Sequence, residues 1–224
     1  MIPMRAISSY LNNMDDIAIE ESSGKWWSGD LKNIYIGTNR IGDAEVSFKF
    51  LNIFIGKTEF VIKISGQDIE FQGQVGKSIL GDTLIQDAKF NIDVIKAYSK
   101  GKAIPQPISS LRGEIEYLRF KSTKCIKAQG DAIAEVMDVL GIFRRNISVS
   151  SSIECKDKNL RVTFESQQEG TLSGEIIITP DLTYELIARS DNITSKIKEL
   201  TKLNFNQTPT IKSSGTFLDL IEAL

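Results

Sequence analysis

The sequence predicts a mainly β protein, built from curved antiparallel sheet with one short helix near the start and one near residues 191–203. Its strongest signal is the alternation of apolar and mostly polar residues over 45–50, 59–64 and 88–94. A period of two is typical of strands with one face on a core and the other in water. The second signal is a set of glycines that separate these runs at turn-like spacing: Gly37, Gly42, Gly56, Gly66, Gly73 and Gly81.

Two segments depart from this period and predict helices. Over residues 3–14, Pro3 suits a first helical turn. It precedes apolar residues at helical spacing: Met4, Ile7, Leu11 and Met14. Over residues 191–203 an Asp or Asn cap precedes three such residues: Ile193, Ile197 and Leu200. Residues 131–140 fit either a helix or a buried strand, and we favour a strand.

Strands continue through the second half of the chain. Residues 160–165 alternate, and Pro180-Asp181 supplies a turn between 175–179 and 183–188, which indicates a hairpin. A last strand is expected within 213–220. Three runs begin with Gly, an acid and an aliphatic residue, at unequal spacing: those at Gly29, Gly113 and Gly174. Unequal spacing excludes a solenoid of fixed period and favours similar strands side by side in one curved sheet.

The chain of 224 residues is long enough for one large β unit or two small domains. Only residues 99–107 resemble a linker, because Pro105 and Pro107 favour an extended path there. We therefore expect a β-rich half at 1–100, a connector at 99–107 and a second β-rich half at 108–224.

Charge and hydropathy exclude several classes of protein. The net charge is −2, and lysines are scattered among acids, so no nucleic-acid partner is expected. No run of 18 or more apolar residues occurs, and the start lacks the pattern of a signal peptide.

The sequence also lacks the residues of common catalytic and metal sites. There is no histidine, which removes the commonest general base and most nucleophile and metal arrangements. Gly76-Lys77-Ser78 imitates the end of a phosphate-binding loop, but Phe71 stands where that loop needs a glycine. We expect no enzyme, no cofactor and no bound metal.

Two cysteines, Cys125 and Cys155, lie on segments that are expected to be strands. In a cytosolic protein they would be small buried side chains. In an exported protein they would form one disulfide, closing a loop of about 30 residues and worth roughly 3–4 kcal/mol. We favour the disulfide.

The most informative stretch is Gly24-Lys25-Trp26-Trp27-Ser28-Gly29, which holds both tryptophans of the chain. Glycine permits a turn or a close backbone approach at each end, and an indole is a large apolar anchor. The simplest interpretation is a strand that begins and ends at glycine, with Trp27 filling the core.

This stretch resembles the Gly-x-x-Trp-Ser-Gly signature near the start of the periplasmic domain of type II secretion system protein N. The matching motif residues are Gly24, Trp27, Ser28 and Gly29. Cys125 and Cys155 resemble the family's second-half cysteine pair, which implies a disulfide between them. Four later residues resemble its Leu-x-Gly strand, acid and aromatic turn: Leu172, Gly174, Asp181 and Tyr184.

The resemblance implies a non-enzymatic scaffold or interaction domain at the periplasmic face of the bacterial inner membrane. It implies other type II secretion proteins, from the inner-membrane platform or the pseudopilus, as partners. It also implies membrane contact through the family's short anchor, for which no segment is recognised in this chain. Edges of long alternating strands are compatible with partner strands pairing there.

An alternative is a periplasmic lipid-binding protein similar to AsmA or to lipoprotein carriers. Such proteins hold lipid on the concave apolar face of a curved sheet, and five phenylalanines were candidates to line it: Phe48, Phe50, Phe60, Phe90 and Phe164. The same residues also fit a dry core, which is the commoner use of an alternating face. A nucleotide-binding enzyme using Lys77 is not expected.

Overall fold

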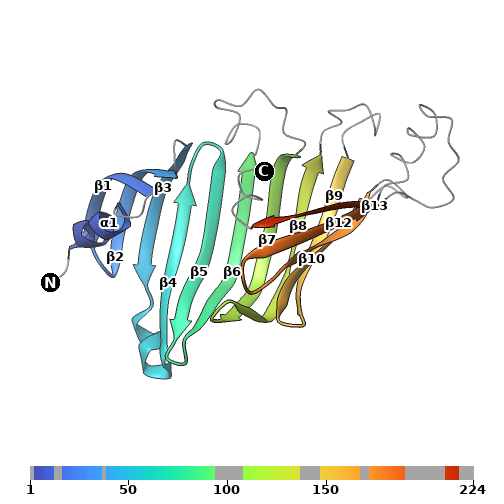
Figure 1. Ribbon diagram of the computed structural model, residues 1–224. Coiled ribbons are helices and arrows are strands. Elements are labelled where there is room, and N and C mark those ends of the chain that lie inside the picture. The colour runs from blue at the N-terminus through green and yellow to red at the C-terminus, as the bar shows by residue number, and fades with distance from the viewer. Residues whose placement is uncertain are drawn as a thin grey trace, which may run out of the picture.

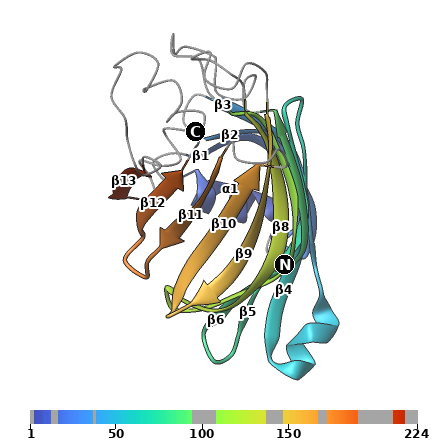
Figure 2. The same cartoon turned by 90° about the vertical axis from the view of Figure 1, so that its right-hand side faces the viewer.

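The computed structural model describes residues 3–12, 17–36, 39–93, 108–136, 147–166, 172–189 and 210–216. It contains one open antiparallel sheet of 13 strands, in which each strand pairs with its neighbours in sequence. Figures 1 and 2 show that the sheet curls into a trough, with β10 to β13 turned toward the side on which α1 lies. The prediction of a mainly β fold built on curved antiparallel sheet is therefore confirmed.

The helices and strands follow one another without crossovers. The elements of the first half are α1 (Met4–Leu11), β1 (Ile17–Lys25), β2 (Ser28–Ile36), β3 (Asn39–Phe48), the 3-10 helix η1 (Phe50–Ile55), β4 (Lys57–Ser65), β5 (Ile69–Ser78) and β6 (Asp82–Asp93). Those of the second half are β7 (Ile108–Lys121), β8 (Lys124–Val136), β9 (Ile147–Lys156), β10 (Asn159–Ser166), β11 (Ser173–Ile178), β12 (Thr183–Arg189) and β13 (Thr210–Thr216).

An apolar face runs along the sheet because strand alternation places like residues in the same row. Phe60 of β4 pairs with Val75 of β5, which pairs with Ile85 of β6. Farther along, Val162 of β10 lies between Ile153 of β9 and Ile176 of β11. All six side chains are half-buried rather than buried. The described part of the sheet thus keeps an accessible apolar face.

Helix α1 covers the N-terminal end of this face. Met4 is 2% exposed and forms a core cluster with Ile19, Leu31 and Ala44. The hydroxyl of Ser8, also buried, lies 2.9 Å from that of Ser22 on β1. Burial of one large apolar side chain is worth about 1.5–3 kcal/mol, so Met4 contributes substantially to the attachment of α1 to the sheet.

Several local predictions can be compared with the structure. Residues 131–136 belong to β8, as the favoured strand interpretation requires, and β11 and β12 form the expected hairpin around Pro180-Asp181. Strands β6 and β7 pair directly, although the connector 99–107 between them lies outside the described residues. The helix expected at 191–203 also lies outside them, and the division into two halves stays a prediction.

The predicted end of the third strand was wrong. The alternation through Val46 and Phe48 was expected to continue to Phe50, but β3 ends at Phe48 and Phe50 begins η1. The chain turns there because six mostly apolar residues, Phe50–Ile55, have no period of two, and Gly56 then adopts a left-handed conformation (φ 75°) that ends the 3-10 helix. Within the described residues, no helix has the length and apolar character needed to cross a bilayer.

Candidate interaction site

The glycine-flanked tryptophans form the turn of the first hairpin, not the interior of a strand. Lys25 of β1 pairs with Ser28 of β2, so Trp26 and Trp27 are the two residues between them. The carbonyl of Trp27 accepts a 2.7 Å hydrogen bond from the amide of Phe48 on β3. This bond fixes the turn against the third strand. The expectation that Trp27 lies on a strand is therefore wrong, and its side chain is half-buried.

An aromatic cluster forms around this turn. The ring of Trp26 lies 5.6 Å from that of Trp27, 5.3 Å from Phe48 and 6.1 Å from Phe50. Phe48 also contacts Phe60, with ring centroids 5.0 Å apart. These separations are typical of favourable aromatic pairs. The cluster joins the first hairpin to η1 and β4, so it holds one end of the sheet together.

The motif glycines stand where backbones meet closely. Gly24 and Gly29 are directly opposite in the β1–β2 ladder. Gly24 has φ +91°, and a Cβ there would lie 2.6 Å from the carbonyl oxygen of Ser28. A Cβ on Gly29 would lie 2.5 Å from the carbonyl oxygen of Ser23 and 3.0 Å from Met4 Cγ. Both positions therefore need glycine, and Gly29 also provides the surface on which α1 rests.

The second group of motif residues lies about the β10–β12 hairpins. The carbonyl of Leu172 accepts a hydrogen bond from the amide of Ser166, and a Cβ on Gly174 would meet the ring of Phe164 at 2.6 Å. Asp181 is exposed in the β11–β12 turn, whereas Tyr184 is half-buried on β12. The structure does not bring these four residues together with the tryptophan turn. Their functional role stays a prediction.

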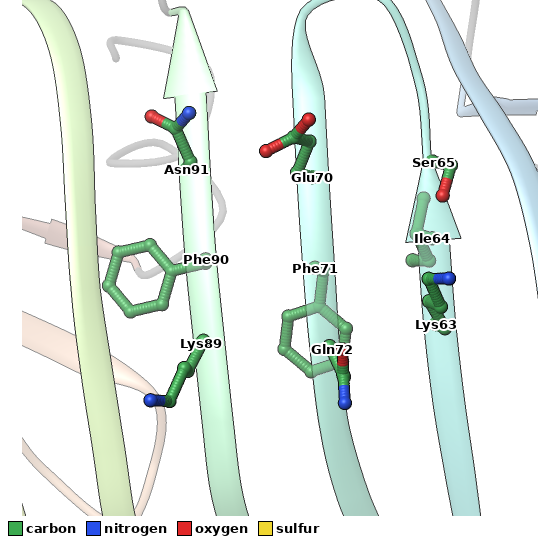
Figure 3. A pocket seen from close by; sticks show the side chains of 9 residues that line it. All are labelled: Lys63, Ile64, Ser65, Glu70, Phe71, Gln72, Lys89, Phe90 and Asn91. Carbon is green, nitrogen blue, oxygen red and sulfur yellow. The ribbon is translucent and has the colours of Figure 1, made fainter.

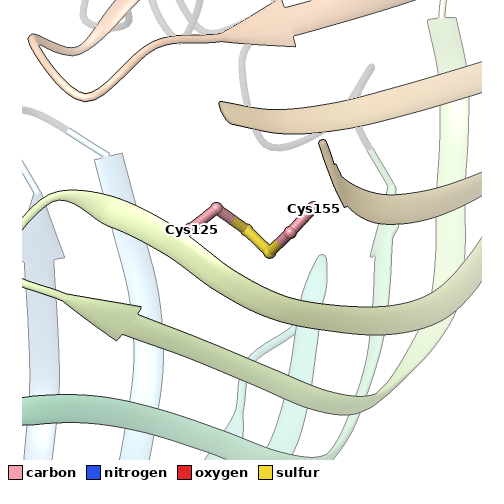
Figure 4. The surroundings of a disulfide bond; sticks show 2 residues. All are labelled: Cys125 and Cys155. Atoms are coloured by element: carbon pink, nitrogen blue, oxygen red, sulfur yellow. A yellow bond between two sulfur atoms is a disulfide. The ribbon is translucent and has the colours of Figure 1, made fainter. Parts of the chain in front are cut away.

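Cys125 and Cys155 form a disulfide, with their Cα atoms 5.5 Å apart (Figure 4). The β8–β9 ladder runs from Gly130–Ile153 to Val136–Ile147, so the cysteines lie beyond its end. The amide of Cys125 also donates a 2.9 Å hydrogen bond to the carbonyl of Lys158. The disulfide therefore joins two strands at the point where their own hydrogen bonds stop.

Two hollows lie near the end of the sheet that carries the β4–β5 turn, which is the end away from the tryptophan turn and the disulfide. One, of about 360 Å³, is lined by Ile64, Phe71 and Phe90 in one row, with polar residues around them (Figure 3). The other, of about 410 Å³, contains Asp68, Glu70 and Asp93 in its lining. No group of histidine, cysteine, aspartate and glutamate side chains suited to a metal ion occurs among the described residues.

The five phenylalanines proposed for a lipid groove differ in exposure and belong to different elements. Phe48 is buried, at 8% exposure, inside the aromatic cluster, and Phe50 belongs to η1. Phe60, Phe90 and Phe164 are half-buried on three different strands, β4, β6 and β10.

Comparison with protein families matches residues 15–203 to protein N of the type II secretion system. The chain belongs to the type II secretion system protein N family. The match spans most of the chain, from just after α1 through the tryptophan turn, the disulfide and the hairpins that follow. No significant match was found among curated protein sequences or solved structures.

Membership of the protein N family has direct consequences. The protein is an inner-membrane-associated component of the type II secretion system, and it takes part in protein transport with other components of that system. The match does not support the alternative of a lipid carrier.

Gly76-Lys77-Ser78 ends strand β5 and is followed by the β5–β6 turn, so it lacks the helix start that a phosphate-binding loop needs.

Sequence reasoning missed one prominent surface. Residues of η1 and of the β5–β6 turn are apolar and exposed, with Phe54 at 86% and Ile79 at 84%. The signal was available as an unalternating apolar run between Lys49 and Gly56. Only Phe50 of this run was included in a predicted element, as the last residue of the alternation over 45–50.

Proposed function

We propose that the protein is a non-enzymatic periplasmic scaffold, which holds components of the inner-membrane platform or the pseudopilus during export of folded proteins. The observation that carries this proposal is the protein N match over residues 15–203. The fold is compatible, because an open sheet has two edges and a wide face at which partners can bind.

The two edges differ in their readiness to accept a partner strand. At β1, Asn12 occupies the edge: its Oδ1 accepts a 2.7 Å bond from the amide of Ile19, and its Nδ2 donates a 3.1 Å bond to the carbonyl of Ile19. Pro3 forms a bridge with Lys25 farther along the same strand. Both contacts block strand addition at β1, so this edge is protected.

Strand β13 is the favoured contact edge. In the described part of the chain it pairs with β12 alone, and Lys212 and Ser214 on it are exposed. A strand edge of this kind accepts an extended segment of a partner through main-chain hydrogen bonds.

Site-specific photo-crosslinking in cells with an intact secretion system tests this role. We expect a photoreactive residue at Lys212 or Ser214 to capture a platform or pseudopilus component. The same residue at exposed Glu20, on the protected edge, serves as the matched control. Equal capture from both edges, or from neither, would contradict the proposed contact edge.

A further inference from the structure

Exposed apolar side chains gather at one end of the sheet. In an up-and-down sheet, the turns after odd-numbered strands share one end. All the large apolar side chains that are exposed among the described residues lie at this end. Eight of them are in the turns after β3, β5 and β11, and Ile126 comes just after the β7–β8 turn. The eight are Phe50, Leu51, Ile53, Phe54, Ile55, Ile79, Leu80 and Leu182. Such one-sided exposure marks an interaction surface rather than scattered surface residues.

Two neighbouring turns supply seven of these residues, and they form one projection. We call residues Phe50–Ile55 with Ile79 and Leu80 the apolar tip. The amide of Ile79 donates a 2.9 Å hydrogen bond to the carbonyl of Gly56, and a Cβ on Gly56 would lie 3.0 Å from Ile79 Cδ1. Figures 1 and 2 show η1 and the β5–β6 turn projecting together beyond the lower end of the sheet.

The same end of the sheet is basic. The six turns at this end, with two flanking residues on each side, contain three aspartates: Asp82, Asp157 and Asp181. They contain eight lysines, which we call the basic rim: Lys25, Lys49, Lys57, Lys77, Lys121, Lys124, Lys156 and Lys158. Asp82 is paired with Arg119 and Lys49 with Glu59, and the whole chain carries a net charge of −2. Positive charge is therefore concentrated at this end of the sheet, and Lys57 and Lys77 directly flank the two turns of the tip.

Three further features distinguish the end of the sheet that carries the apolar tip from the opposite end. Both tryptophans lie beside the tip, through the contacts of Trp26 and Trp27 with Phe50. Pro3, the first described residue, bridges Lys25 at this end. The opposite end carries acidic residues about the β4–β5 turn, as its second hollow indicates. The distribution of charge thus favours an orientation in which the end that carries the apolar tip faces an anionic surface.

We propose that the apolar tip inserts into the surface of an anionic phospholipid bilayer, with the basic rim on the headgroup phosphates. A projecting apolar tip beside lysines and tryptophans has the composition of a membrane-interface anchor. Lysine is depleted in protein–protein interfaces, which argues against a protein as the occupant. Lysines near an anionic surface strengthen binding and make it sensitive to salt. This inference does not depend on the secretion role.

Flotation of the 224-residue chain with vesicles tests the proposal directly. We expect binding to vesicles of phosphatidylglycerol and phosphatidylcholine, and at least about tenfold weaker binding to phosphatidylcholine alone. The double variant Leu51→Ser with Phe54→Ser should bind the anionic vesicles at least roughly tenfold more weakly, because two large apolar side chains leave the bilayer. Ala18→Ser, which makes an exposed position at the opposite end of the sheet more polar, is the control and should bind like the unchanged chain.

The charge contribution has its own pair of variants. Lys57→Glu with Lys77→Glu should weaken anionic binding by about tenfold or more, and Lys63→Glu, exposed farther along β4, should leave it unchanged. Binding of the unchanged chain should also weaken as the salt concentration is raised to 0.5 M, because the Debye screening length then shortens to about 4 Å. Circular dichroism melting establishes that each variant remains folded.

Tryptophan fluorescence identifies the end that docks. Both tryptophans of the chain lie beside the tip, so brominated phospholipids should quench their emission when the chain binds. Absence of binding to anionic vesicles, or binding without quenching, would overturn the proposal. So would lipid-independent self-association that the Leu51→Ser and Phe54→Ser double variant abolishes, because the tip would then be an interface between copies.

Discussion

Met4 lies directly over Gly29, and this contact joins helix α1 to the tryptophan hairpin. Met4 is 2% exposed, and a Cβ on Gly29 would approach its Cγ to 3.0 Å. In this chain Gly29 thus leaves room for Met4, the residue that packs the preceding helix onto the sheet. The motif serves the assembly of one corner of the sheet.

The first prediction concerns this contact. Gly29→Ala should lower the free energy of unfolding by about 1–3 kcal/mol, because the new methyl group must displace Met4 or the backbone at Ser23. Met4→Ala should cost about 2–5 kcal/mol through the cavity it leaves. Urea denaturation measures both. Since the two changes act at one contact, their effects should not add, and simple additivity would contradict the account.

The two tryptophans should differ in their contribution to stability. Trp26 contacts three aromatic rings, whereas Trp27 contacts two, together with Lys25 Nζ at 5.0 Å from its ring. Trp26→Ala should therefore destabilise the protein more than Trp27→Ala, by roughly 1 kcal/mol. Urea midpoints provide the comparison. If Trp27→Ala proves the more damaging, Trp27 has a structural partner that these contacts do not account for.

The disulfide should contribute substantially to stability. It closes a loop over a sequence separation of 30 at the end of the β8–β9 ladder. Replacing both cysteines with serine should cost about 3–4 kcal/mol by the chain-entropy model. The unfolding midpoint with and without a reducing agent measures this directly, and the double serine variant should no longer respond to the reductant. Identical midpoints for the oxidised and reduced protein would count against it.

Loss of the Asn12 side chain should promote self-association of the protein more than it lowers the stability of the fold. Asn12→Ala frees the amide and carbonyl of Ile19 at the β1 edge. We expect a loss of about 1–2 kcal/mol and a concentration-dependent growth in particle size, because an unprotected edge pairs with other chains. Light scattering over a concentration series detects this. Asn91→Ala, which changes an exposed asparagine on the interior strand β6, is the control and should stay monodisperse.

The sequence predicted what depends on local pattern. Alternation over 59–64 and 160–165 identified strands β4 and β10, because which face a residue occupies is set within the strand itself. Pro180-Asp181 marked the β11–β12 turn for the same local reason. These features needed no knowledge of distant partners.

Features set by distant contacts could not be predicted in the same way. Trp26 and Trp27 adopt a turn because Phe48 and Phe50 pack on their rings, and neither contact is visible in local periodicity. The apolar tip was missed because an unalternating run resembles a buried segment until its exposure is known. Pairing of Cys125 with Cys155 was favoured from the expected compartment, whereas their proximity depends on the β8–β9 pairing.

The participation of this protein in type II secretion can be tested through the extracellular protein profile of cells that lack its gene. A strain complemented with the gene is the control. We predict that enzymes normally exported by the system disappear from the medium and accumulate in the periplasm, while the outer membrane stays intact and complementation restores export. Normal secretion together with altered envelope lipid or permeability would contradict the account.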